Sequence, residues 1–299
     1  MPVLETDETP RTESHASEGA PSLLVGYDAS EGGRDALELA RIFHSMLGGR
    51  VLVASAASHG PAPGRHRPSE GERAAVEALF EQARLHIGLP KVEARALAGG
   101  SPAKLLIECA EVDAAQTLVL GSPHRGVVGR ALIGSVAKGV LYGAPCEVVV
   151  APRGYADRVH VPYRTIAVAY DGSEEAEAAL RRAEDLARPN RASIEILTVA
   201  EAPVTPATVW GGIAPAQLSD PDKILNGAIE SVDERLAVQG RRLEGEVATT
   251  LARACENSVD LLVAGSRGYG PAARVLLGSV TGRLIQDAPC PVLVVPRAG

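Results

Sequence analysis

The residues whose types and spacing best suit chemistry lie in a glycine-rich stretch near the end of the chain. A block of four residues and a later Gly-Ser pair frame nine others: Gly265, Ser266, Arg267 and Gly268, then Gly278 and Ser279. Glycines let the backbone turn tightly around an anion, and a helix that begins at Gly278 directs its N–H groups and positive dipole end toward that anion. The two serine hydroxyls add hydrogen-bond donors. The pattern predicts a phosphate-binding loop, with a flexible surface loop as the alternative.

A second polar motif follows two hydrophobic runs. Asp28 and Asp171 each end such a run and stand two residues before a serine, Ser30 or Ser173. Their side chains suit either a ligand contact or the cap of a following helix, because Ser and Asp oxygens accept hydrogen bonds from the free N–H groups at helix starts. The stretch Ser30–Ala36 contains a glycine pair that its counterpart lacks. We interpret that stretch as a helix start.

Both motifs occur twice because the chain repeats itself. The offset is 143 or 144 residues for four pairs: Asp28 with Asp171, Gly121 with Gly265, Gly134 with Gly278, and Ser135 with Ser279. A constant offset of this length indicates a duplicated domain, since solenoid repeats span only about 20–50 residues. We expect a disordered tail over residues 1–20, domains over 21–153 and 163–297, and a linker over 154–162.

Runs with strand character alternate with helical periodicity in each copy. In the second copy the expected strands are Thr165–Tyr170, Ser193–Val199, Arg241–Glu244, Leu261–Ala264 and Val292–Val295. Helical patterns cover Glu174–Ala187 and Val247–Glu256, and in the first copy Ala36–Leu47 and Arg73–Ile87. The alternation predicts an α/β fold of two tandem doubly wound domains, each with a parallel sheet. Ligands of such sheets bind beyond the carboxyl ends of the strands, where the polar motifs fall.

Composition narrows the classes of function. Hydrophobic residues make up 45% of the chain but aromatic residues only 3%, which suits buried parallel strands between Ala-rich helices. A formal charge of −7 without a Lys or Arg run disfavours nucleic-acid binding. No apolar stretch reaches the roughly 18 residues of a membrane span, so we expect a cytoplasmic protein. The cysteines lack metal-ligand spacing and are predicted to be buried, reduced thiols: Cys109, Cys146, Cys255 and Cys290.

Three features together resemble one known family. They are the Gly-x2-Gly-x9-Gly-Ser pattern, the AspGlySer that ends the first strand of the second copy, and the terminal stretch APCPVLVVP at residues 288–296. The chain resembles the universal stress protein family in its tandem form, with an adenine nucleotide alpha hydrolase-like fold. The resemblance covers nearly all of residues 21–297. It implies a five-stranded parallel sheet in each domain and an interface made by the last strands. It also implies ATP as the ligand of members that keep the glycine motif.

The resemblance assigns roles in the second copy. Asp171 would contact the adenine or ribose end of ATP, and Val199 would line the base pocket. The phosphates, with a divalent cation (Mg²⁺ or Mn²⁺), would be held by the loop residues Gly265, Ser266, Arg267, Gly268, Gly278 and Ser279. The corresponding residues of the first copy are Asp28, Gly121, Gly134 and Ser135.

The first copy departs from the pattern in its loop. His124, preceded by Pro123, stands where the second copy has Gly268, although Gly134 and Ser135 stay in register. A proline and an imidazole restrict a backbone that must turn freely, so nucleotide is expected mainly in the second domain.

The resulting hypothesis is an ATP-binding regulatory protein of the stress response, with an adenine nucleotide and an unidentified protein as partners. A slow ATPase or nucleotide-dependent transferase is one alternative, although no residue near the loop is an evident base. A ligand-free interaction module is the other. The strands Cys146–Val150 and Pro291–Val295 are expected to pair antiparallel and form an intramolecular pseudo-dimer. A further homodimer stays open.

Overall fold

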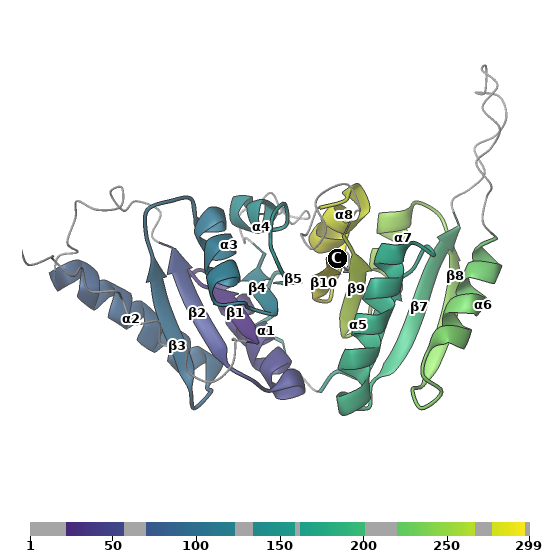
Figure 1. The fold of residues 1–299 in the computed structure, drawn as a ribbon, viewed down its shortest axis with the longest axis horizontal. Helices are drawn as coiled ribbons and strands as arrows, with labels where there is room; N and C mark the ends of the chain where they lie inside the picture. The colour runs from purple at the N-terminus through teal and green to yellow at the C-terminus, as the bar shows by residue number, and fades with distance from the viewer. Residues whose placement is uncertain are drawn as a thin grey trace, which may run out of the picture.

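The computed structural model describes residues 22–56, 70–122, 134–158, 162–200, 220–266 and 277–296. The first half contains nine elements in strict alternation (Figure 1): β1 (Leu23–Gly26), α1 (Glu31–Leu47), β2 (Val51–Ala56), α2 (Glu70–Ile87), β3 (Val92–Leu97), α3 (Pro102–Val112), β4 (Thr117–Gly121), α4 (Ser135–Val140) and β5 (Glu147–Ala151). The predicted tail, residues 1–20, lies outside the described residues.

The second half repeats this order: β6 (Thr165–Ala169), α5 (Glu174–Asn190), β7 (Ser193–Ala200), α6 (Pro221–Ser231), β8 (Val238–Glu244), α7 (Val247–Ala254), β9 (Leu261–Gly265), α8 (Ser279–Asp287) and β10 (Val292–Val295). All five predicted strands of this half are present. β8 starts three residues earlier than expected, because Val238, Gln239 and Gly240 already pair with β7. α5 continues three residues past the expected end, through Pro189 in its last turn, and Arg191 then stops it with a left-handed φ of 54°.

The ten strands form one sheet in the order β3-β2-β1-β4-β5-β10-β9-β6-β7-β8. All pairings within a half are parallel, and the central pairing of β5 with β10 is antiparallel. Its register matches Val292 with Val150, Leu293 with Val149, and Val294 with Val148. The predicted pairing of the last strands is confirmed, and so are two tandem doubly wound domains.

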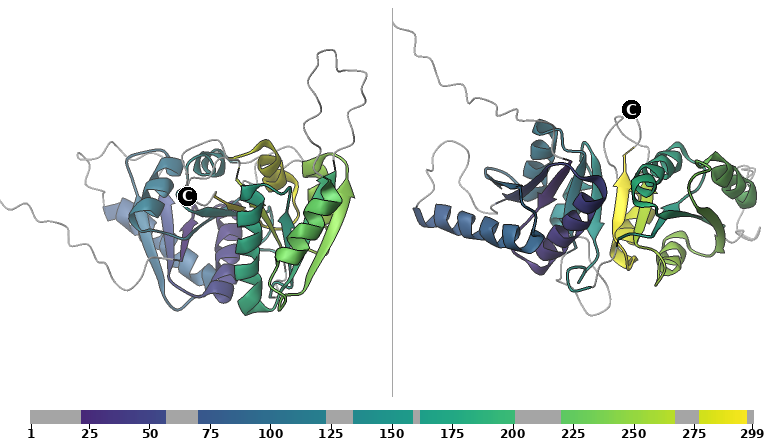
Figure 2. Two further views of the ribbon diagram at one scale, coloured as in Figure 1. Left: turned by 45° about the vertical axis from the view of Figure 1, so that its right-hand side comes forward. Right: turned by 90° about the horizontal axis from the view of Figure 1, so that it is seen from below.

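Helices cover both faces of the sheet (Figure 2). Successive strand residues point to opposite faces, so Leu23 and Val25 join the core under α1 and α5, whereas Leu24 joins the core under α3 and α7. Aliphatic residues fill both cores, and Phe43 is the bulkiest fully buried side chain in the described part of the chain. The composition therefore predicts the layers correctly.

One buried ion pair joins the halves beside the central strands. Arg182 of α5 donates to both carboxylate oxygens of Glu147 on β5, at 2.7 Å each, and Thr117 of β4 also donates to Glu147. The Glu147 side chain is only 9% exposed and that of Arg182 21%. A buried carboxylate needs such partners, because it loses its hydration on folding.

The segment between the halves is fixed by a buried carboxylate on α1. Asp35, 1% exposed, accepts hydrogen bonds from the backbone N–H groups of Gly154 (3.0 Å) and Ala156 (2.7 Å). The hydroxyls of Tyr155 and Tyr163 are 2.6 Å apart. These contacts hold residues 154–158 of the predicted linker against α1.

We predict that Arg182→Met lowers the free energy of unfolding by about 3 kcal/mol, because it leaves the Glu147 carboxylate buried without a counter-charge. Arg181→Met is the matched control. Its side chain is 60% exposed and lies 3.7 Å from Glu177, so a change within about 0.5 kcal/mol is expected. Urea unfolding of both variants measures the difference. Equal losses for the two variants would show that the buried ion pair does not stabilise the fold.

All four cysteines are free and buried, as predicted. Burial raises the pKa of the Cys109 thiol to about 11 and that of Cys146 to about 12. Cys290 hydrogen-bonds Cys255, and this contact together with burial holds the pKa of Cys290 well above its ordinary value.

These shifts predict a loss of stability at alkaline pH. In the unfolded chain the thiols of Cys109, Cys146 and Cys290 ionise near pH 8.5, whereas in the folded protein these three thiols keep their protons until much higher pH. Stability is therefore full below about pH 8.5 and falls above it, by up to about 1.4 kcal/mol per pH unit for each thiol. Denaturant unfolding between pH 7 and 11 measures this slope, and Cys146→Ala should make it shallower. A flat profile would contradict the account.

Candidate functional site

A cavity of about 710 Å³ opens at the carboxyl ends of β1 and β4 in the first half. Between these two strands the chain order reverses, the place where doubly wound sheets bind ligands. The cavity brings together all four residues that the sequence proposed for this half, Asp28, Gly121, Gly134 and Ser135. They come from the ends of β1 and β4 and the start of α4, and Asp28 and Ser135 are more than a hundred residues apart in the chain.

Both aspartates organise the start of the next helix. Asp28 Oδ1 accepts from the Ser30 N–H (3.2 Å) and hydroxyl (2.5 Å), and Ser30 Oγ caps α1 by accepting from the N–H of Gly33 at 3.1 Å. The second half repeats this turn, with Asp171 Oδ1 at 3.0 Å from the Ser173 N–H and 2.6 Å from its hydroxyl. The helix cap expected from this motif is confirmed. The described hydrogen bonds engage only Oδ1, which leaves Oδ2 for a ligand.

The glycines that end β4 and β9 have a packing role that the sequence did not reveal. A methyl group on Gly121 would overlap the carbonyl oxygen of Gly32, and one on Gly265 would lie 2.6 Å from that of Glu175. Each glycine therefore lets the first turn of the first helix of its half, α1 or α5, approach the strand end. The sequence signal for this packing role is that a glycine ends the fourth strand in both copies, at Gly121 and Gly265.

Gly134 and Gly278 begin α4 and α8. Their φ values, −62° and −73°, are open to any residue, so these positions do not need a glycine for its backbone freedom. Neither helix has a side-chain cap at this end. The free N–H groups and the exposed hydroxyls of Ser135 and Ser279 suit an anion at both helix starts.

Two serines follow the strand-end glycines. Ser266 and Ser122 are 2% and 3% exposed, and their N–H groups donate to Val295 and Ala151 of the neighbouring last strands. The hydroxyl of Ser266 is buried and has no hydrogen-bond partner among the described residues. Val199, half-buried near the end of β7, packs against the core under α7 and α8.

The middle of each loop lies outside the described residues. This holds for Arg267 and Gly268 in the second half and for His124 in the first. The frame around each loop is described, and it places Asp171, Gly265, Ser266, Gly278 and Ser279 at strand ends and helix starts of the second half, as in the first.

The halves differ in charge where the first helix begins. The first turn of α5 carries Glu174, Glu175 and Glu177, whereas that of α1 carries only Glu31. An anion bound at the carboxyl edge of the second half therefore lies near more carboxylates than an anion bound at that of the first half. A divalent cation would offset that charge.

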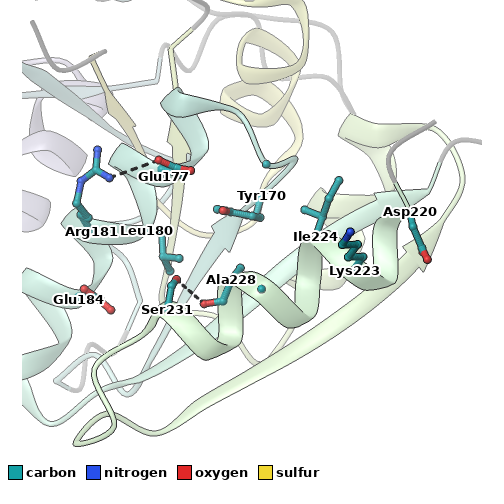
Figure 3. A pocket seen from close by; sticks show the side chains of 12 residues that line it. Tyr170, Glu177, Leu180, Arg181, Glu184, Asp220, Lys223, Ile224, Ala228 and Ser231 are labelled. Carbon is teal, nitrogen blue, oxygen red and sulfur yellow. Dashed lines mark hydrogen bonds and ion pairs between the residues drawn. The ribbon is translucent and has the colours of Figure 1, made fainter. Parts of the chain in front are cut away.

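A cavity of about 960 Å³ lies elsewhere in the second half, between α5 and α6 (Figure 3). Tyr170, Leu180 and Ala228 supply its apolar surface, and charged side chains such as Glu177 and Lys223 surround it. None of the residues proposed for the nucleotide lines this α5/α6 groove. Its lining includes Tyr170 and Gly172, the two chain neighbours of Asp171.

Within the described ranges, no group of three or more His, Cys, Asp or Glu side chains is placed to hold a metal ion. No described helix is both long and apolar enough to cross a bilayer.

Comparisons with known proteins agree on one family. The model of the universal stress protein family matches residues 21–152 and 162–296. A universal stress protein of Mycobacterium tuberculosis (strain H37Rv) is 29% identical over 92% of this chain and 99% of its own. One from Bacillus subtilis is 33% identical over 44% of this chain and 99% of its own. The crystal structure of an Archaeoglobus fulgidus universal stress protein has a TM-score of 0.67 at 19% identity, over 93% of this chain and 99% of its own.

We predict that Gly265→Ala lowers the free energy of unfolding by about 1–3 kcal/mol, because the new methyl group meets the Glu175 backbone at 2.6 Å. Gly227→Ala on α6 is the matched control. Nothing lies within 4 Å of its added methyl group, so a gain of about 0.5–1 kcal/mol is expected. Thermal and urea unfolding report both changes. If Gly265→Ala were as stable as the unmodified protein, the packing role of Gly265 would be refuted.

Proposed function

Because both halves of the chain belong to the universal stress protein family, we propose that it binds an adenine nucleotide at the carboxyl edge of its sheet. The ligand is ATP with Mg²⁺ or Mn²⁺, and the protein acts as a nucleotide-dependent regulatory module of the stress response. One observation carries the proposal: the cavity that gathers Asp28, Gly121, Gly134 and Ser135. Four residues chosen for phosphate and ribose chemistry share one space, and the second half repeats their frame.

The second half is the main site in this proposal. It keeps Gly268 where the first half has His124, so its loop has the backbone freedom that close approach to phosphates requires. Asp171 presents Oδ2 to the nucleoside, and Val199 lies at the end of the strand next to it. Ser266 supplies a buried hydroxyl without a partner among the described residues, and the free N–H groups of α8 point to the phosphates.

The divalent cation arrives with the nucleotide. Since the described residues contain no cluster able to hold a metal alone, the phosphate oxygens and water supply most of its ligands. The cation offsets both the phosphates and the carboxylates at the start of α5, Glu174, Glu175 and Glu177. Removing it with a chelator should therefore weaken ATP binding.

Binding rather than turnover is the proposed activity. Each aspartate at the edge already accepts two hydrogen bonds within its own turn, which holds Oδ1 as a structural acceptor. Fast phosphoryl transfer needs a positioned base or an arginine that stabilises the transition state.

The test is a calorimetric titration with ATP and Mg²⁺ of Asp171→Asn and of its matched control Asp28→Asn. Asparagine keeps an Oδ1 acceptor for the capping turn and removes the charge, so the fold is retained. We expect Asp171→Asn to weaken the tighter site about tenfold, the worth of one hydrogen bond to a charged group. Asp28→Asn should leave that site unchanged. Equal effects of the two substitutions, or two equal sites in the unmodified protein, would contradict the assignment to the second half.

A further inference from the structure

The first turn of α1 forms part of the wall of the first-half cavity. Ser30, Gly32 and Gly33 all line it, together with the strand-end residues Gly121 and Ser122. α1 follows β1, which borders the switch point of its sheet, so the positive end of the helix faces the crevice. At 17 residues, α1 is long enough for a full helix dipole.

This turn has a backbone donor to offer. The Gly33 N–H is used by Ser30 Oγ, and the Arg34 N–H by the carbonyl oxygen of Ser30. The Gly32 N–H, one position earlier, has no hydrogen-bond partner among the described residues. It is one of the N–H groups that the geometry of a helix start leaves without an internal acceptor.

An independent observation comes from the strand opposite. Ser122 is 3% exposed and lines the same cavity, and its N–H already donates to Ala151. Its hydroxyl has no hydrogen-bond partner among the described residues. A side chain that is buried to this degree and faces a cavity normally has a partner, and here a ligand can supply it.

The second half does not repeat this arrangement. Glu175 and Ala176 stand where the first half has Gly32 and Gly33, and Glu174 and Glu177 flank them. The glycine pair also lets α1 lie closer to its strand than a residue with a side chain permits, since a methyl group on Gly32 would lie 2.6 Å from the Ser122 carbonyl oxygen. The two halves therefore differ in the first turn of their first helix, which is uncharged at its glycine pair in α1 and carboxylate-rich in α5.

We propose that the first half holds the phosphates of its nucleotide on the first turn of α1, and not on the loop after β4. The Gly32 N–H and the Ser122 hydroxyl are the donors. The inference rests on the proposed function and assigns the phosphate position in the half whose loop carries His124. Glu31 lines the same cavity beside this turn, and the divalent cation bound with the phosphates offsets its charge.

The experiment uses the full chain with Asp171→Asn as background, which weakens the second-half site. Calorimetric titration with ATP and Mg²⁺, and separately with adenosine, measures the first half. Adding Ser122→Ala should weaken ATP binding about tenfold and leave adenosine binding unchanged, because only the phosphates use the hydroxyl. Gly32→Ala displaces the turn and should have the same selective effect. His124→Ala is the matched loop control and should change neither affinity.

Each other outcome is decisive. Loss of ATP binding on His124→Ala but not on Ser122→Ala would overturn the inference and leave the proposed function standing. An equal loss of ATP and adenosine on Ser122→Ala would overturn it as a structural effect. A background protein that binds no ATP, beside an unmodified chain that does, would overturn it and confine the nucleotide to the second half. Absence of ATP binding in the unmodified chain would contradict the proposed function itself.

Discussion

The antiparallel pairing of β5 with β10 is the contact on which the architecture depends. Without it, each half would expose the backbone of a largely apolar, buried strand, an open edge prone to association. With it, the outermost strands are β3 and β8, whose charged residues, among them Arg95 and Arg242, suit an edge in water. The strand direction reverses at this pairing. Each half therefore builds a site from its own strand ends and helix starts.

Folding and site formation are coupled through the glycines that end β4 and β9. Gly121 and Gly265 admit a helix start against the strand end, and this approach delimits the space that a ligand can enter. The helix residue that packs against the strand-end glycine is Gly32 in the first half and Glu175 in the second. The two halves therefore share this packing contact but differ in charge at it. Duplication kept the frame and allowed the two edges to diverge in charge. The halves consequently offer different surroundings to the same class of ligand.

Much of this was predictable because the repeat marks it twice. Element order, the central pairing and the Asp-x-Ser caps all follow from matched residues 143 or 144 positions apart. The ion pair between Glu147 and Arg182 could not be predicted from the repeat. Its two residues correspond to Pro291 and Leu39 in the other copy, and neither of these carries a charge. The packing role of Gly265 was also missed, because spacing alone does not separate a glycine needed by a phosphate from one needed by a helix. The first-turn donors were hidden in a stretch that was interpreted only as a helix start.

The central claim is that the carboxyl edges of this sheet bind adenine nucleotide. Native mass spectrometry of the full chain with ATP and Mg²⁺ tests it most directly, because it counts bound nucleotides per chain. The account predicts one bound ATP at low concentration, a second at higher concentration, and about tenfold weaker binding at both sites in the double variant Asp28→Asn/Asp171→Asn. A chain that binds no ATP, or a double variant that binds as much as the unmodified protein, would contradict it.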